Sequence, residues 1–220
     1  MKTKRVLMVM TRDVPQTATN GRERTLQFIR EAIGSEIELK EIKLRSVFET
    51  PGVMPKLSAL ARLARGFVMA KPCALQIAMF SERHYMNVLA QTLHDFAPDV
   101  IYIDGIRLVD HLPHIARLTN GRPIIVDFDD LMSRRATALR SARTPLSAGY
   151  LTRFVPAFMM RTINSHALRD ALLRYEAHCL TRQEREAVEI AHAVTLVSTT
   201  DAAALNQVLD PRTRRKVHVI

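Results

Sequence analysis

The chain has 220 residues, of which 47% are hydrophobic and 25% charged, and it carries a formal net charge of +10. This composition is typical of a globular protein, and no apolar run reaches the roughly 18 residues that a transmembrane helix requires. The two cysteines, Cys73 and Cys179, are far apart, which argues against a disulfide framework and indicates a cytosolic protein. No cysteine or histidine spacing supports a zinc site, so we predict no bound metal.

The positive charge is concentrated in two segments. Residues 52–80 contain four basic side chains and no acid, and residues 131–163 contain six arginines and no acid. Together these segments account for the whole net charge of +10, so the rest of the chain is neutral. A basic patch on a neutral body indicates an anionic partner, which is either lipid headgroups, a phosphorylated substrate or nucleic acid.

Strands and helices alternate from the start of the chain. Lys4 to Met10 is a short apolar run without a signal-peptide cleavage site, and it predicts a buried parallel strand. A loop follows over 11–20. Helical spacing from Gly21 to Gly34 then precedes a second strand over Glu36 to Lys43. The order of strand, loop, helix and strand predicts a βαβ unit.

The alternation continues to the end of the chain. Further helices are expected over 51–72, 73–96, 108–118, 168–191 and 200–208, and further strands over 98–103, 123–128, 193–197 and 216–220. Pro145, Gly149 and Pro156 interrupt any long helix within 131–163. This pattern predicts an α/β fold, with a Rossmann-like parallel sheet covered by helices on both faces. We expect residues 1–220 to form one domain, with 131–163 as a basic excursion on its surface.

Ligand-binding residues are expected just after the strands, because ligands of open parallel sheets bind beyond the carboxyl ends of the strands. The segments in these positions are 11–21, 104–105, 127–133 and 198–201, and we expect all four to converge on one edge. For 198–201 the favoured interpretation is an N-cap for the helix that follows.

Three residues at the start of the first helix are candidates for binding phosphate or an acceptor. Asn20 and Gly21 stand at a predicted helix N-terminus, where free N–H groups and the helix dipole favour an anion, and Arg22 follows them. The alternative is that Gly21 only permits a turn. Neither a dinucleotide fingerprint nor a P-loop motif is present. Asp104 is a further acceptor-binding candidate, with a turn role for Asp104-Gly105 as the equal alternative.

The densest acidic cluster lies at the end of the strand expected over 123–128. Carboxylates there can accept hydrogen bonds from sugar hydroxyls or act as a base. Asp129 and Asp130 are therefore candidate catalytic residues, and Asp127, Ser133 and Arg134 are candidate acceptor-binding residues. The alternative for Asp129 or Asp130 is N-capping of the helix that follows.

The basic segments fit a membrane surface better than nucleic acid. The chain has no tryptophan, is 5% aromatic, and shows no helix-turn-helix or RNP signature. Residues 131–163 mix arginine with bulky apolar side chains, which is typical of an interfacial membrane segment, although a solvated arginine-rich surface is the alternative. The candidate membrane-surface residues are Lys56, Arg62, Arg65, Arg140, Arg143, Arg153, Phe154, Phe158 and Arg161.

Five stretches together resemble the N-terminal domain of glycosyltransferase family 4, whose members have the two-domain GT-B fold. They are KRVLMVM, PDVIYIDG, RPIIVDFDD, YEAHCLTRQEREAVEIAHAVTLVSTTDAAAL and KVHVI. The resemblance is closest to the sugar transferases of bacterial exopolysaccharide clusters, where a D-F-x-D-x-x-S segment follows the fourth strand, as residues 127–133 do here. The loop over 11–21 departs from the pattern, with one glycine where relatives often carry two.

The resemblance implies an acceptor-binding domain for retaining, metal-independent transfer from a nucleotide sugar to a lipid-linked or polysaccharide acceptor. It also implies a second Rossmann-like domain that binds the donor. We expect that domain to be absent from these 220 residues, so that this chain binds no cofactor and is inactive without it. The implied location is the cytoplasm, peripheral to the inner face of the plasma membrane. The alternative is a noncatalytic α/β binding module that acts with a separate donor-domain chain.

Overall fold

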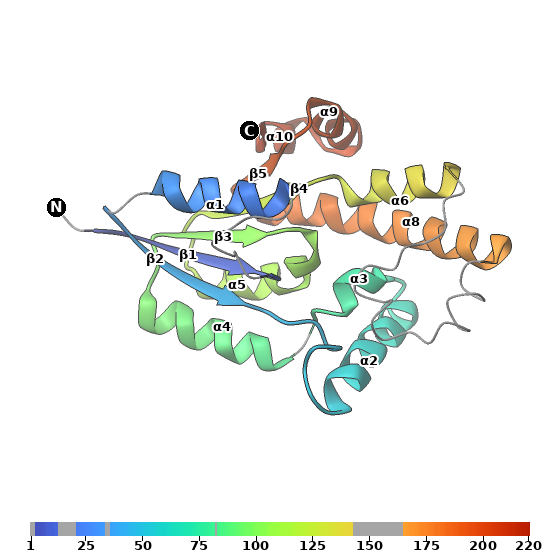
Figure 1. Ribbon diagram of the computed structural model, residues 1–220, viewed down its shortest axis with the longest axis horizontal. Helices are drawn as coiled ribbons and strands as arrows, with labels where there is room; N and C mark the ends of the chain where they lie inside the picture. The colour runs from blue at the N-terminus through green and yellow to red at the C-terminus, as the bar shows by residue number, and fades with distance from the viewer. Residues whose placement is uncertain (1–2, 13–20, 34–35, 82, 143–164) are drawn as a thin grey trace.

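A parallel sheet forms the centre of the computed structural model, which describes residues 3–12, 21–33, 36–81, 83–142 and 165–220 (Figure 1). Six strands pair in the order β2-β1-β3-β4-β5-β6, and every pair is parallel. The strands are β1 (Lys4–Met10), β2 (Ile37–Lys43), β3 (Val100–Asp104), β4 (Ile124–Asp129), β5 (Ala193–Leu196) and β6 (Val217–Val219). The predicted α/β, Rossmann-like fold is therefore confirmed.

The central strands are apolar throughout because both of their faces are covered. In β1, Leu7 and Val9 enter one hydrophobic cluster, while Met8 and Met10 point to the other face and enter a second cluster. Side chains alternate between the two faces of a strand, so a strand buried on both sides needs a continuous apolar run. This is the physical reason why the KRVLMVM run predicts a strand.

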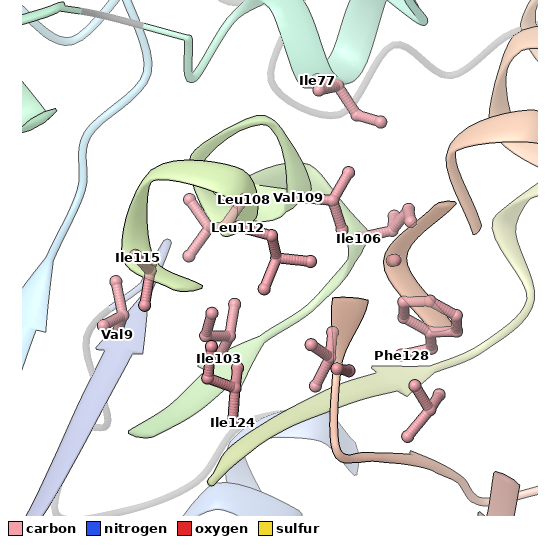
Figure 2. Close-up of a cluster of buried hydrophobic side chains, with 14 of the residues drawn as sticks. Val9, Ile77, Ile103, Ile106, Leu108, Val109, Leu112, Ile115, Ile124 and Phe128 are labelled. Carbon is pink, nitrogen blue, oxygen red and sulfur yellow. The ribbon is translucent and has the colours of Figure 1, made fainter. Parts of the chain in front are cut away.

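Helices cover both faces of the sheet. On one face, α1 (Gly21–Ile33) packs its Leu26 against β1 and β3. On the opposite face lie α4 (Arg83–Phe96), α5 (Leu112–Leu118) and the long helix α8 (His166–Ile190), which share one large hydrophobic cluster with the strands. Figure 2 shows part of this cluster, including Leu112 and Ile115 of α5. The remaining C-terminal helices, α9 (Thr199–Val208) and α10 (Pro211–Arg214), accompany β5 and β6.

Two expected helices are each divided in the structure. Residues 73–96 form the short helix α3 (Leu75–Ala78) and then α4, and the helix expected over 108–118 consists of a 3-10 turn, η1 (Ile106–His111), followed by α5. Pro113 lies in the first turn of α5 and cannot donate a backbone hydrogen bond to the preceding turn, which explains the second division.

The segment expected as a surface excursion contributes a helix to the fold. Its residues 132–141 form α6 (Met132–Ser141), which packs along α8 and buries Ala136. Arg169 of α8 is itself buried and donates hydrogen bonds to the carbonyl oxygens of Leu139 (2.6 Å) and Arg140 (3.3 Å) at the end of α6. Residues 143–163 of this segment lie outside the described residues.

The sheet reverses its direction of growth between β1 and β3. The chain passes from β1 outward to β2 at one edge, and then returns to place β3 on the other side of β1. Such a switch point leaves a crevice at the carboxyl ends of the two strands, which is where open α/β sheets bind ligands. Within the described residues, the structure contains no helix whose length and apolar character would allow it to cross a membrane.

Candidate functional site

A polar pocket lies at the switch point, beyond the carboxyl ends of β1, β3 and β4. Its wall combines arginines and carboxylates from several elements with backbone and apolar groups. The lining residues are Thr11, Arg12, Arg22, Gln76, Asp104, Gly105, Ile106, Arg107, Phe128, Asp129, Asp130, Met132 and Arg135. Gly105 has a φ of 90°, a conformation that favours glycine, and its amide donates to the carbonyl oxygen of Asp127, which turns the chain sharply after β3.

A buried arginine ties three elements together beneath this pocket. Arg22 of α1 donates from Nε to Asp104 Oδ1 (2.9 Å) and from Nη1 to Asp127 Oδ2 (2.8 Å), and its Nη2 also bonds to Asp104. Tyr102 of β3 donates its hydroxyl proton to the same Asp127 carboxylate. Asp127 is fully buried and Asp104 nearly so. The cluster therefore consists of buried charges of opposite sign that bind one another at the base of the pocket.

The surroundings of Arg22 and Tyr102 keep both side chains protonated. Burial opposes the charge on Arg22, but the neighbouring Asp104 and Asp127 carboxylates outweigh it and raise the pKa of the guanidinium above its ordinary value. Burial raises the pKa of Tyr102, with the Asp127 carboxylate adding to the effect. Arg22 therefore stays charged and Tyr102 stays a hydrogen-bond donor at neutral pH.

Two buried atoms in the pocket wall face each other without a hydrogen bond. Within the part of the chain that the structure describes, Arg12 Nε and Asp104 Oδ2 have no hydrogen-bond partner. They lie 3.8 Å apart, which is too long for a direct bond. The two charged side chains therefore attract each other as an ion pair that lacks a hydrogen bond between these two atoms.

The two candidate catalytic carboxylates lie at the pocket rim. β4 is irregular between Asp127 and Asp129, and Asp129 has a φ of 62° with its amide donating to Asp127 Oδ1 (3.1 Å). Asp130 lies 3.3 Å from the Arg135 guanidinium. The N-capping alternative for either residue is wrong, because α6 begins at a Leu131 cap with no side-chain bond. A bulge at a strand end is a common way to aim a side chain into a site.

The free energy of unfolding is expected to depend on pH through Asp129, and the variant D129N should lack this dependence. Burial raises the pKa of Asp129, helped by Asp130 and Asp127 and opposed by Arg22 and Arg12. The folded chain thus binds this proton more tightly than the unfolded chain, and the contribution of Asp129 to stability falls as pH rises from its ordinary pKa to the raised one. Asparagine tolerates the same backbone conformation, so D129N should remove this fall in stability with rising pH. Urea midpoints of both proteins across the acidic range measure it, and parallel curves would contradict the assignment.

The remaining acceptor-binding candidates do not line the pocket or lie outside the described residues. Ser133 is buried, and its amide and hydroxyl donate to the Glu184 carboxylate of α8 at 2.9 and 2.6 Å, respectively. Arg134 pairs with Asp201, so neither residue joins the pocket lining. Gly21 begins α1 at an exposed position away from that lining, and Asn20 lies outside the described residues.

The four strand-end segments converge only in part. The described parts of 11–21, together with 104–105 and 127–133, contribute to the pocket, but 198–201 does not. There the expected N-cap is confirmed, because Ser198 Oγ accepts from the Asp201 amide at 3.3 Å. The Asp201 carboxylate also accepts a hydrogen bond from the Leu131 amide (3.2 Å), so this segment holds the chain just after β4.

The candidate membrane-surface residues divide into three groups. Lys56 and Arg65, on α2 (Met54–Val68), are exposed. Arg62 was expected to face a membrane, but it instead forms a two-point ion pair with Asp110 at 2.6 and 2.9 Å. Arg140 lies 3.7 Å from the Asp170 carboxylate. The others, Arg143, Arg153, Phe154, Phe158 and Arg161, lie outside the described residues.

Several residues of the site are not singled out by the sequence pattern. Arg12 directly follows a predicted strand, so its position is the signal that could have identified it. Tyr102 stands on the face of β3 opposite to Ile101 and Ile103, and a polar-tipped residue within an apolar strand marks a place where a buried partner is required. Gln76 and Arg107 offer no comparable signal.

The fold and the pocket together define a Rossmann-like α/β protein with a polar site at its switch point. No protein-family model matches the chain, and no curated protein matches it significantly.

Proposed function

We propose that this chain is the acceptor-binding domain of a glycosyltransferase related to family 4, and that the polar pocket binds the acceptor glycan. A Rossmann-like sheet with its ligand site at the carboxyl edge supports this proposal, as does the resemblance of five sequence stretches to that family. The donor nucleotide sugar is assigned to a second domain, in the same polypeptide or in a partner chain. The proposed setting is polysaccharide synthesis.

The observation that carries the proposal is the pocket itself, whose wall brings arginines and carboxylates together beyond the carboxyl ends of β1, β3 and β4. The carboxylates of this wall can accept hydrogen bonds from sugar hydroxyls, and its guanidinium groups can donate to the hydroxyl oxygens. Sugars present hydroxyls with this dual capacity. Arg107 and Arg135 in the same wall add positive charge, which suits an acceptor that also carries a phosphate.

The chemistry assigned to the site is recognition of the acceptor and activation of its hydroxyl. Asp104 and Asp127 are already bound to Arg22, so Asp129 and Asp130 at the rim are the carboxylates assigned to proton transfer. The raised pKa of Asp129, caused chiefly by burial, brings its proton affinity closer to neutral pH, as expected of a general base or acid. The proposed acceptor is lipid-linked or a polysaccharide, met at the cytoplasmic face of the plasma membrane.

Replacement of Arg12 by glutamine is expected to weaken sugar binding about tenfold or more, because a charged donor to a ligand hydroxyl is lost. The probes are methyl glucoside and glucose 1-phosphate, with dissociation constants measured by NMR titration of the 220-residue chain. R24Q is the matched control, since Arg24 is exposed on α1 and the charge change is the same. UDP-glucose should not bind, because the donor site is assigned to the other domain. Equal affinities for R12Q and the unmodified chain would refute the assignment of this pocket.

The alternative is a noncatalytic binding module that works with a separate donor-domain chain. The hydrogen bonds among Arg22, Asp104, Asp127 and Tyr102 favour it, because groups that bind one another hold structure rather than act on a substrate. The two readings differ in the assembled enzyme. D129N and D130N should abolish transfer if the rim carboxylates act chemically, and should leave turnover intact if this chain only binds.

A further inference from the structure

The helix α2 presents an apolar face outward. Its inner side is buried at Pro55, Ala59 and Gly66. On the outward side and at the helix ends, large hydrophobic side chains are more than half exposed: Val53, Met54, Leu57, Leu60, Phe67, Val68 and Met69. Val68 is 84% exposed and Leu60 is 62% exposed. Contiguous exposed apolar surface of this kind marks an interaction site.

Contacts on the inner side of α2 fix the orientation of its outward face. Arg62, on the inner side of α2, pairs with Asp110 of η1, which also accepts from Ser81 Oγ at 2.7 Å. At Gly66 an added Cβ would lie 2.9 Å from the Lys71 carbonyl oxygen, so the following chain packs closely against the helix there. α2 is therefore anchored in one orientation, and its apolar face is preformed.

The charged side chains that the segment 52–80 itself contributes are all positive. Lys56 and Arg65 are exposed and nine positions apart, which places them about 180° apart around the helix, at the two borders of the apolar arc. Lys71 is exposed just beyond the helix, and residues 52–80 contain no acid. An apolar helix face bordered by lysine and arginine is the pattern of a helix that lies in a membrane interface, with its cations at the headgroups.

We propose that α2 is the membrane-docking element of this protein and that its outward face inserts into a bilayer containing anionic phospholipid. A second copy of the chain is a poorer occupant, because a self-complementary contact would bring the same cations together with no acid from 52–80 to neutralise them. Anionic headgroups supply the charge that the face lacks.

The position of α2 links the membrane to the pocket. α2 lies beyond the ends of β1 and β2, next to α3 (Figure 1), and Gln76 of α3 lines the pocket. Through Arg62 and Asp110 the helix is also tied to η1, which follows Gly105 at the pocket wall. A docked α2 therefore sets the pocket beside the lipid surface. If the proposed function holds, and this step rests on it, the acceptor is lipid-linked.

The chain has no tryptophan, so a single introduced tryptophan reports on one site. L60W should show a blue-shifted emission with vesicles of phosphatidylcholine and phosphatidylglycerol, and quenching by brominated lipid, but neither with phosphatidylcholine alone. F28W is the control, since Phe28 is 70% exposed on α1, and its emission should not change. In flotation, L60D should weaken binding to the anionic vesicles about tenfold, whereas F28D should not. Binding should fall as salt is raised.

Three results would overturn the inference. They are the absence of a shift for L60W, equal flotation of L60D and F28D, and a shift without lipid that grows with protein concentration, which would assign the face to a second copy. Methyl glucoside titration of the unmodified chain separates this test from that of the pocket. If the unmodified chain binds the sugar but not the anionic vesicles, the docking inference is lost and the proposed function stands. If it binds the vesicles but not the sugar, the docking inference stands and the assignment of the pocket is lost.

Discussion

Replacement of Arg22 by methionine is expected to lower the free energy of unfolding by about 3–5 kcal/mol, the range typical of removing one partner from a buried ionic cluster. The variant keeps an unbranched side chain but leaves Asp104 and Asp127, both buried, without their shared cation. Tyr102 alone cannot neutralise either carboxylate. Urea denaturation followed by circular dichroism measures the change.

R24M is the matched control for this prediction. Arg24 lies two residues further along α1 and is exposed, so the same loss of charge should change stability by less than about 0.5 kcal/mol. R22K tests the geometry, because lysine keeps the charge but cannot bridge two carboxylates as a planar guanidinium does, and it should fall between the two. If R22M is as stable as R24M, Arg22 does not hold α1, β3 and β4 together as described.

Replacement of Glu184 by alanine is expected to cost about 2–4 kcal/mol. Glu184 is almost completely buried in α8, and each of its oxygens accepts a bond from Ser133, at the start of α6. Its removal leaves a buried amide and hydroxyl without partners and opens a cavity. Burial raises the pKa of Glu184, so the ionised form costs some stability at neutral pH, which moderates the loss. Chemical denaturation at neutral pH measures it.

A double-mutant cycle separates the two bonds. S133A removes the hydroxyl but not the amide, so the double variant E184A/S133A should be less destabilised than the sum of the single variants. E189A is the control, because Glu189 is exposed on the same helix and the substitution is the same. Strict additivity of E184A and S133A would show that the carboxylate does not hold the serine hydroxyl.

The framework of the sheet could be predicted closely from the sequence. The runs over 4–10 and 123–128 are continuous and apolar because β1 and β4 are buried, and their boundaries agree with the structure to within about a residue. The division of 73–96 could not be predicted. The amides of Leu75 and Gln76 are bound by Glu176 of α8, a hundred residues later, and local spacing carries no information about that contact.

The sequence could indicate individual residues of the site, but not which side chains bind one another. Asp104 and Asp127 stand at strand ends and Arg22 stands at a predicted helix start, yet Arg22 is separated from the two aspartates by 82 and 105 residues. Spacing of that size cannot show that the three side chains bind one another instead of a ligand. Ser133 is a similar case, since its partner Glu184 lies 51 residues away.

The long helix α8 has a mechanical consequence for the pocket. Its Glu176 carboxylate accepts a hydrogen bond from the start of α3, and its Glu184 carboxylate accepts one from the start of α6. The two glutamates are eight residues, or about 12 Å, apart along the same helix. Gln76 and Arg135, which these two helices carry into the wall, are thereby kept at a fixed spacing. The part of the wall that α3 and α6 contribute is therefore held by one helix, α8.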